Sequence, residues 1–274
     1  MKKKILGLLI AFGLSVPAFA SITVSPTRLE INANKIRNNY VSTAIEIKGE
    51  TDKPVRYRAY AGYFSVSDKG DMLMDDNVND SHNISKQIRF VPSEFTVPPG
   101  KSQKVRVNIA NIKSLPDGES RAILYLEDVN PKEMNVPNNF GIGAQLILKT
   151  RVGVPVYVDK GNFKKIGDVE SFEVIKSQNG YVAQAKILSK GNSKIRYYGK
   201  IQVVKGKKLI DEISIESHVV GAENSYTLKE VISKDKFKEA GEYTVRLVLT
   251  YNDENDNKKN IKKDAILEMK GEKI

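Results

Sequence analysis

From residue 22 onward the chain alternates apolar and polar residues, and many of the apolar ones are β-branched or aromatic. Successive side chains of a β-strand point to opposite faces of a sheet, so this period of two predicts strands with one buried face. Short stretches rich in aspartate, proline and glycine separate the alternating segments and are typical of turns. In the first half of the chain the expected strands are residues 22–24, 29–31, 41–47, 55–64, 87–91, 104–109, 120–129 and 143–158.

A charged, glycine-containing segment, residues 159–163, interrupts this pattern and predicts a junction between two domains. A second, shorter series of expected strands follows it: residues 172–176, 181–188, 195–204, 213–215, 226–231, 243–251 and 264–269. Many short strands without a convincing helical segment predict antiparallel β-sandwiches, and the lack of a fixed repeat argues against a solenoid. We therefore expect an all-β protein of two tandem β-sandwich domains, residues 21–158 and 159–274.

The first twenty residues have the pattern of a secretory signal peptide. Positive charge comes first, at Lys2, Lys3 and Lys4, and an apolar run over residues 5–16 follows. That run is shorter than the roughly 20 residues that span a bilayer. Pro17 then ends the run, and Ala-Phe-Ala at 18–20 provides the small residues that signal peptidase requires. We expect cleavage after Ala20 and a mature protein that works outside the cytoplasm.

Composition narrows the function further. The chain has no cysteine, so it forms no disulfide, and its stability depends on its hydrophobic cores. Its formal charge is +11, or 11 − 3 = +8 without the three lysines of the signal peptide, and no long basic block occurs. Export argues against a nucleic-acid partner, whereas an acidic partner or a membrane surface stays open. No other segment approaches the length of a membrane span, so we expect no stable membrane insertion.

The sequence offers little that predicts catalysis. Its two histidines, His82 and His218, lie among polar neighbours and have no metal-ligand spacing. A Gly-x-Ser-x-Gly motif is missing, although a Ser–His–Asp triad is spatial and sequence alone does not exclude one. The acidic stretches 71–80 and 252–257 lack the ligand pattern of a calcium loop and are expected to be solvated. We expect a protein that is not an enzyme and holds no cofactor or metal.

Four spaced motifs mark the first domain. Residues 25–31 read Ser-Pro-Thr-Arg-Leu-Glu-Ile, residues 98–106 read Pro-Pro-Gly-x-x-Gln-x-Val-Arg, and residues 115–120 read Leu-Pro-x-x-Glu-Ser. The last motif is Val-Asn-Pro at 129–131. Their order and spacing resembles the N-terminal domain of the periplasmic pilus-assembly chaperones of the chaperone–usher pathway, the PapD-like family. A weaker match in the second domain is Gly241-x-Tyr243-x-Val245, which leads to Tyr251.

The resemblance implies two immunoglobulin-like sandwiches and a mechanism called donor-strand complementation. In that mechanism the chaperone lends a strand to an incomplete immunoglobulin-like pilus subunit. Main-chain hydrogen bonds supply the affinity, and alternate apolar side chains fill the groove of the subunit. The candidate donor is the segment 141–148, with Ile142, Ala144, Leu146 and Leu148 on one face. The preceding polar segment 132–139 resembles the long loop before the donor strand of the family. An ordinary strand with one face in its own core fits the same pattern.

The family also holds the C-terminal carboxylate of the subunit on two cations between its domains. Arg28 matches the first of these, and a guanidinium there can bind a carboxylate through two hydrogen bonds. The second cation is a lysine in the family, but Gly153 occupies its place in this chain. Arg151 or Lys160 could take over that role. Pro155 predicts that the strand around it is an edge strand or ends there.

These observations together predict a divergent chaperone of the periplasm. Its expected partners are pilus or fimbrial subunits and the outer-membrane usher, and the unbound protein could pair with a second copy through its donor strand. The alternative is an exported structural or adhesive β-sandwich protein that binds a component of the cell envelope. The glycine at position 153 is the main feature that favours this alternative.

Overall fold

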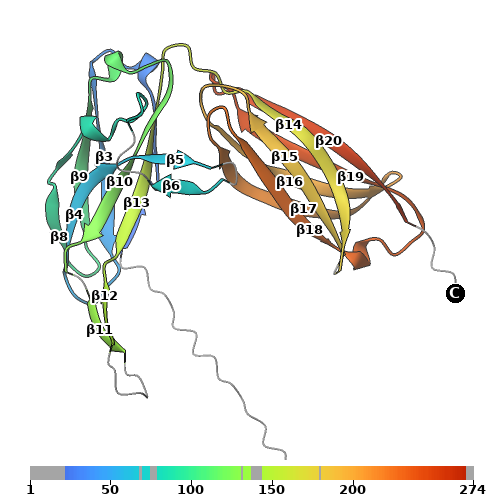
Figure 1. The fold of residues 1–274 in the computed structure, drawn as a ribbon, viewed down its shortest axis with the longest axis horizontal. Coiled ribbons are helices and arrows are strands. Elements are labelled where there is room, and N and C mark those ends of the chain that lie inside the picture. Colours follow the sequence, from blue (N-terminus) through green and yellow to red (C-terminus); the bar gives the residue numbers. More distant parts are fainter. Residues whose placement is uncertain are drawn as a thin grey trace, which may run out of the picture.

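The computed structural model describes residues 22–67, 70–74, 79–130, 132–136, 144–178 and 180–269. Two elongated β-sandwiches meet at an angle and are joined at one end (Figure 1). This arrangement confirms the prediction of an all-β protein with two tandem sandwiches. The predicted signal peptide lies outside the described residues. Within the described ranges, no helix has the length and hydrophobicity that a membrane crossing requires.

The first sandwich packs a sheet of order β1-β3-β9-β7 against a sheet of order β2-β13-β10-β4-β8. The strands of the first sheet are β1 (Ile22–Ser25), β3 (Tyr40–Gly49), β9 (Ser102–Ala110) and β7 (Ile88–Val91). Those of the second sheet are β2 (Leu29–Asn32), β13 (Arg151–Lys160), β10 (Gly118–Asp128), β4 (Val55–Gly62) and β8 (Glu94–Val97). Alternate residues such as Ile45, Val107, Leu124 and Val156 are fully buried between the sheets. This strand order is that of an immunoglobulin-like sandwich.

The second sandwich packs a sheet of order β14-β15-β18 against a sheet of order β17-β16-β19-β20. The strands are β14 (Gly167–Ser177), β15 (Gly180–Ser189), β16 (Ile195–Lys205), β17 (Lys208–Val220), β18 (Ser225–Ser233), β19 (Gly241–Asn252) and β20 (Lys258–Met269). Tyr243, at the start of β19, donates its hydroxyl hydrogen to the carbonyl of Glu239 at 3.1 Å and accepts the amide hydrogen of that residue. Immunoglobulin-like sandwiches use such a tyrosine corner at this strand.

Short 3-10 helices complete the described secondary structure, at Ala33–Lys35, Ser85–Gln87, Ile112–Ser114 and Lys234–Lys236. The connection between the two sandwiches runs from residue 161 to residue 166, between the end of β13 and the start of β14.

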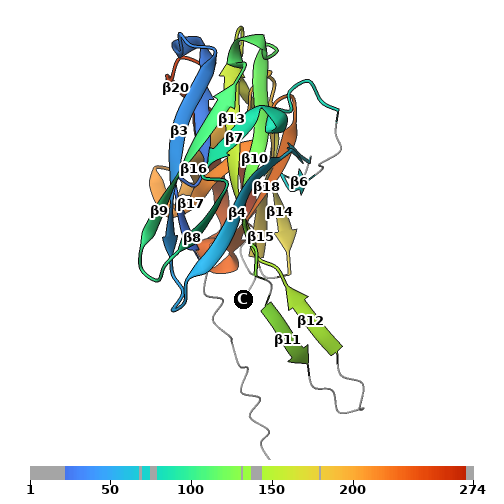
Figure 2. The ribbon, with the colours of Figure 1, turned by 90° about the vertical axis from the view of Figure 1, so that its left-hand side faces the viewer.

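The structure corrects the prediction of one long strand over residues 143–158. The segment forms two strands, β12 (Ala144–Leu148) and β13, which are separated by Lys149 and Thr150. Strand β12 pairs with β11 (Lys132–Val136), which lies inside the segment expected to be a loop. The β11–β12 hairpin extends beyond the end of the first sandwich (Figure 2). Alternation alone did not reveal the break, because both strands continue the same period of two.

A second hairpin, which the sequence pattern did not reveal, crosses from the first sandwich to the second (Figure 1). Its strands are β5 (Phe64–Val66) and β6 (Met72–Met74). Phe64 is fully buried and packs edge-on against Tyr157 of β13. The carbonyl of Val66 accepts a hydrogen bond of 2.7 Å from the side-chain amide of Asn224, in the second sandwich. Strand β6 is three residues long and its neighbours are acidic, which is why the segment reads as a loop in sequence.

A buried ion pair joins the two sandwiches. Nζ of Lys194, just before β16, lies 3.3 Å from Oε2 of Glu119 on β10, and both side chains are almost completely inaccessible. The same ammonium group lies 3.7 Å from the centre of the Tyr157 ring. Nearby, the hydroxyl of Ser193 donates to the carboxylate of Asp159 at 2.7 Å. Because each carboxylate here comes from the first sandwich and each donor from the second, these contacts hold the angle between the domains.

We expect Lys194→Met to destabilise the protein, because it leaves the Glu119 carboxylate buried beside an apolar side chain. Breaking one member of a buried ion pair costs about 3 kcal/mol or more. Chemical denaturation measures the change in the free energy of unfolding. Lys200→Met is the matched control, since Lys200 pairs with Glu212 on the exposed surface and such pairs contribute little.

The double variant Glu119→Gln, Lys194→Met removes both charges and should recover part of the lost stability. Equal losses for Lys194→Met and Lys200→Met would contradict this account of the domain junction.

Candidate functional site

Strand β13 has one open edge over its first half. On one side it pairs with β10 along its full length, from Arg151 to Lys160. On the other side it pairs with β2 only from Val156 onward, where Leu29 is the first partner. Among the described strands nothing covers this side of residues 151–155. An uncovered strand edge presents free N–H and C=O groups to which another strand can add.

Pro155 lies where the open edge ends and the pairing with β2 begins. The expectation of an edge strand at this proline therefore agrees with the register, although the strand does not end there. A proline fits at an unpaired edge because it has no N–H to donate. The open edge is also continuous along the chain with β12, since only Lys149 and Thr150 lie between the two strands.

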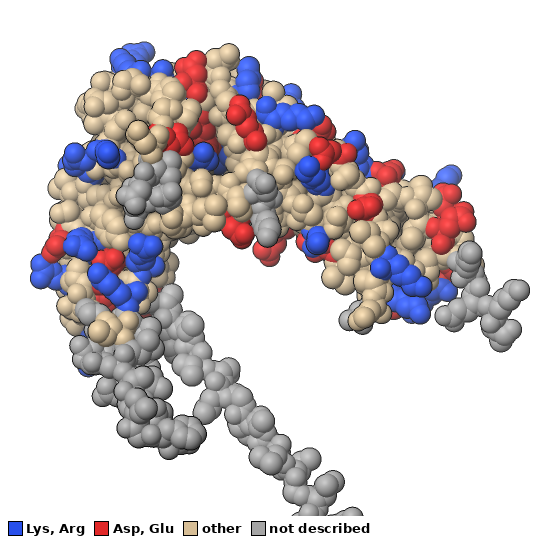
Figure 3. All heavy atoms as spheres, in the orientation of Figure 1, with Lys and Arg blue, Asp and Glu red and all other residues tan. Residues whose placement is uncertain are grey.

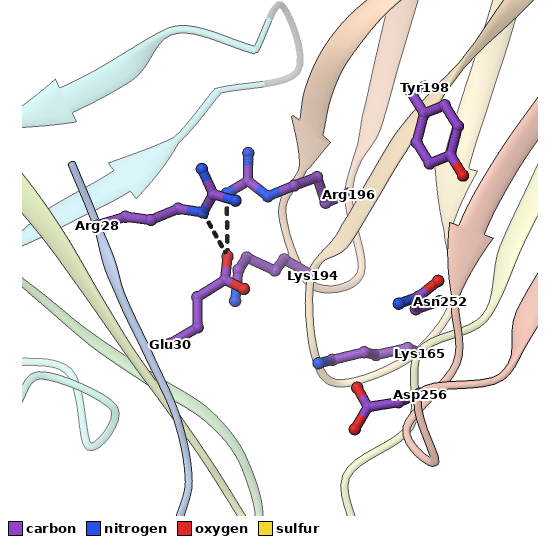
Figure 4. A pocket seen from close by; sticks show the side chains of 8 residues that line it. All are labelled: Arg28, Glu30, Lys165, Lys194, Arg196, Tyr198, Asn252 and Asp256. Carbon is purple, nitrogen blue, oxygen red and sulfur yellow. Dashed lines mark hydrogen bonds and ion pairs between the residues drawn. The ribbon is translucent and has the colours of Figure 1, made fainter. Parts of the chain in front are cut away.

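A cationic pocket lies at the end of this open edge, between the two sandwiches (Figure 4). From the first sandwich it is lined by Arg28 and Glu30, and from the rest of the chain by Lys165, Lys194, Arg196, Tyr198, Asn252 and Asp256. Arg28 directly precedes β2 and so lies level with Pro155 of the neighbouring strand. Its Nε is 3.2 Å from Oε1 of Glu30, and a guanidinium nitrogen of Arg196 lies 3.1 Å from the same oxygen.

The charges of the pocket act on Glu30. Burial alone would raise the pKa of this carboxyl, but the positive charges of Lys194, Arg196 and Arg28 and the hydrogen bond from Arg196 outweigh it. The net result is a lowered pKa. The pocket therefore favours the ionised form of this carboxyl group.

The two proposed substitutes for the second cation lie away from this pocket, at opposite ends of β13. Arg151 is four residues before Pro155, which at about 3.3 Å per residue places it about 13 Å along the strand. Its guanidinium stacks on the Tyr125 ring, 4.3 Å from the centre, and donates to the hydroxyl of Tyr60. Lys160 donates to the carbonyl of Leu115 at 2.6 Å, at the other end of the strand. Neither residue lines the pocket of Arg28.

Position 153 leaves no ready space for a lysine. A Cβ atom at Gly153 would lie 2.6 Å from Cδ1 of Ile123, on the neighbouring strand β10. Ile123 is buried in a small cluster with Phe64, so it would have to move for any side chain at 153. The Ile123 side chain thus occupies the space that a side chain at position 153 would enter, which fits the glycine there.

The expected donor residues lie in or next to β12. Ala144, Leu146 and Leu148 belong to this strand, and the register pairs them with Val136, Met134 and Lys132 of β11. Ile142 lies outside the described residues. Ile147, which lies between Leu146 and Leu148 in this strand, is 59% exposed. Strand β12 pairs only with β11 in a separate two-stranded sheet, so it belongs to neither sandwich sheet among the described strands.

A cluster of polar and charged side chains around Glu127 lies where the β11–β12 hairpin joins the first sandwich. The carboxylate of Glu127, on β10, pairs with Nζ of Lys149 at 2.8 Å and with Arg58 at 2.9 Å. The hydroxyl of Tyr60 donates to the same carboxylate at 3.0 Å. The hydrogen bond from Lys149, supported by those from Arg58 and Tyr60, lowers the pKa of Glu127 to about 2. Since Lys149 lies between β12 and β13, this cluster fixes the point from which the hairpin projects.

Sequence reasoning identified Arg28 but missed Lys194 and Arg196. Both cations lie on one face of the chain, because Ile195 and Tyr197, which alternate with them, are buried in the second sandwich. The alternation was therefore visible in the sequence. What it did not reveal is that this end of β16 faces the first sandwich.

Apart from the pocket, Lys and Arg are spread over the visible face of both sandwiches and mixed with Asp and Glu (Figure 3). Within the described part of the chain, no group of three or more metal-binding side chains is placed to hold a metal ion.

The lowered pKa of Glu127 predicts a pH dependence of stability. The carboxyl titrates near 4.5 in an unfolded chain and near 2 in the folded protein, so its ionised form is favoured by folding. Its contribution is complete above pH 4.5 and is lost as the pH falls toward 2. We expect Glu127→Gln to flatten the fall of the unfolding free energy across this range. Glu94→Gln, which removes the exposed pair with Arg56, should keep the wild-type slope; parallel curves for all three proteins would refute the assignment.

No protein-family model matches the sequence, and no curated protein matches it either. Solved structures of several chaperones are similar to the chain at low sequence identity. The YadV chaperone is 13% identical, with a TM-score of 0.46 over 90% of this chain and 100% of its own. The CupB2 chaperone of Pseudomonas aeruginosa is 12% identical, with a TM-score of 0.43 over 89% of this chain and 100% of its own. The CsuC–CsuE chaperone–subunit complex of Acinetobacter baumannii is 12% identical, with a TM-score of 0.43 over 89% of this chain and 98% of that chain.

Proposed function

We propose that this protein is a periplasmic chaperone that binds pilus-type subunits by donating a strand to them. The observation that carries the proposal is the open edge of β13, which continues into β12 on one side and ends at the Arg28 pocket on the other. A client strand that adds to this edge gains main-chain hydrogen bonds along it. The motifs of the first domain support the same function, through their resemblance to the PapD-like chaperones.

The register shows which end of a bound client strand would meet Arg28. Strand β2 runs parallel to β13 and occupies the edge position only from Leu29 onward. A client strand beside residues 151–155 would occupy the same position in the sheet and stop where β2 starts. If it runs parallel to β13, its C-terminal end meets Arg28. A terminal carboxylate there would form a charge-assisted pair with the guanidinium.

The β11–β12 hairpin supplies the expected apolar donor residues. Strand β12 pairs with β11 and with no other described strand, so its alternate apolar residues Ala144, Leu146 and Leu148 are not committed to either sandwich sheet. An apolar strand outside a folded core is an aggregation risk that proteins normally avoid. We take its presence as support for a client that covers it. Pairing of the unbound protein with a second copy would involve this same strand, and the outer-membrane usher is the proposed recipient of the bound client.

The alternative, an exported structural or adhesive protein, loses part of its support. Its main argument was the missing lysine at Gly153, but the close contact with Ile123 explains that glycine by packing. Gene order offers a direct comparison. A chaperone of this kind should be encoded beside an usher and pilus subunits, whereas an adhesive envelope protein has no such requirement.

We expect Leu146→Glu to abolish binding of a neighbouring-gene pilus subunit when the two proteins are co-expressed with the signal peptide in place. A charged side chain at a donor position cannot enter the apolar groove of the client, because burying an unpaired charge is strongly unfavourable. Size-exclusion chromatography of the periplasmic fraction measures the complex. Thermal denaturation of the free variant measures whether its own fold is intact.

Ile147→Glu is the matched control, since it introduces the same charge one residue along β12 on the opposite face. This variant should bind the subunit as the wild type does. Equal loss of binding for the two variants, or a large drop in the melting temperature of Leu146→Glu alone, would show that β12 is not a donor strand.

A further inference from the structure

The β5–β6 hairpin presents an apolar strand edge that no other described strand covers. All three residues of β6, Met72, Leu73 and Met74, are exposed, with exposed fractions of 37%, 50% and 44%. Among the described strands β6 pairs with β5 alone, so its other edge is free. Folded proteins normally protect such edges, because an open apolar strand promotes aggregation. The edge of β6 is therefore a candidate binding surface for an extended segment of another chain.

The root of the hairpin is fixed on the first sandwich. Phe64 of β5 is fully buried, and its ring centre lies 5.7 Å from that of Tyr157 on β13. On the other strand of the hairpin, the hydroxyl of Tyr125 donates to Sδ of Met74 at 3.0 Å. Phe64 and Met74 are register partners and so share the face of the hairpin that lies on the first sandwich. Side chains alternate along a strand, so Leu73 lies on the opposite face.

The tip of the hairpin is fixed on the second sandwich. The carbonyl of Val66 accepts a hydrogen bond of 2.7 Å from the side-chain amide of Asn224. A Cβ atom at Gly70 would lie 2.6 Å from a ring carbon of Tyr226, so the backbone of the hairpin lies directly on this ring. Held at both ends, β6 has a defined position between the two sandwiches (Figure 1). A strand that is already ordered loses little further freedom when a partner adds to it.

Strand β6 adjoins the open edge of β13. Tyr125, which contacts Met74, is the register partner of Gly153 in the middle of that edge. The guanidinium of Arg151, at the start of the edge, lies over the same ring, 4.3 Å from its centre. One aromatic side chain therefore contacts both β6 and the first residue of the open edge. A molecule bound along residues 151–155 has β6 beside it.

We infer that β6 is a second binding strand for the client, which places an extended apolar segment along the free edge of β6 and against Leu73. This inference rests on the proposed function for the identity of the partner. It goes beyond that function by giving the client a contact between the two sandwiches, apart from the donor hairpin. The free backbone groups of β6 supply hydrogen bonds to an extended segment, and its apolar side chains select for apolar residues in that segment.

NMR of the methionine methyl groups separates this inference from the proposed function. Apart from Met1 in the predicted signal peptide, the methionines are Met72 and Met74 on β6, Met134 on β11 and Met269 at the end of β20. The protein, isotopically labelled at these methyl groups, is mixed with an unlabelled neighbouring-gene pilus subunit that refolds from denaturant. We expect the signals of Met72, Met74 and Met134 to shift. The signal of Met269 is the internal control and should stay in place.

Each other pattern of shifts has a definite meaning. A shift of Met134 without a shift of Met72 or Met74 overturns the inference and leaves the proposed function intact. Shifts of Met72 and Met74 without one of Met134 support the contact at β6 and count against strand donation by the β11–β12 hairpin. If no signal moves, both are overturned. If Met72 and Met74 move when the free protein is diluted, a second copy of the chain covers β6, which also overturns the inference.

The variant Leu73→Glu tests the contact by affinity. An unpaired charge against an apolar client segment is unfavourable, so we expect the subunit to bind about tenfold more weakly. The melting temperature should stay close to that of the wild type, because Leu73 is half exposed. Val91→Glu is the matched control, since Val91 is 54% exposed on β7 in the other sheet of the first sandwich. Equal affinities for the two variants would overturn the inference.

A disulfide tests whether the client binds to the hairpin in its docked position. A Cβ atom at Gly221 would lie 3.3 Å from Cβ of Val66, close to the separation that a disulfide bridges. The chain has no cysteine of its own, so the variant Val66→Cys, Gly221→Cys contains a single possible bridge. We expect its oxidised form to bind the subunit as tightly as the wild type. Loss of binding on oxidation and its return on reduction would show that the hairpin must move aside for the client, and the inference would be wrong.

Discussion

The buried pair of Glu119 and Lys194 is the contact on which the functional arrangement depends. Each β-sandwich has a complete core of its own, so nothing in either core sets how the two are oriented. The ion pair does so because two charges that are taken out of water must stay together to offset the loss of hydration. Two further contacts also hold this orientation: the hydrogen bond between Ser193 and Asp159, and the hydrogen bond from Asn224 to the β5–β6 hairpin.

The orientation of the domains brings Arg196 opposite Arg28. Neither residue alone forms a pocket: Arg28 precedes an edge strand of the first sandwich, and Arg196 lies on a strand of the second. Held at this angle, they share Glu30 and create a region where a carboxylate is stabilised. The open edge of β13 leads to that region because β2 begins beside Val156 and not earlier. The open edge and the pocket thus form one continuous surface, and this is the surface to which we propose that a client strand binds.

Much of the fold was predictable from local sequence. Strands such as β3, β9, β15 and β19 bury one face, so their alternation is strong and their approximate positions follow from it. The β5–β6 hairpin was missed because β6 is short and acidic residues surround it. The break at Lys149 was missed because a change of pairing partner leaves the alternation intact. Of the candidate anchor, Arg28 lies in the pocket, whereas Arg151 and Lys160 lie at the two ends of β13.

The sequence by itself determined most of the strands, the two-domain organisation and the motifs that resemble the pilus chaperones, because each of these depends on residues close together in the chain. Only the tertiary structure decided which strand edge stays open, why position 153 is a glycine and which cation faces Arg28. These properties depend on contacts between residues far apart in sequence, such as Gly153 with Ile123 and Glu30 with Arg196. Alternation shows which face of a strand is buried, but it does not show which neighbour lies against the other face.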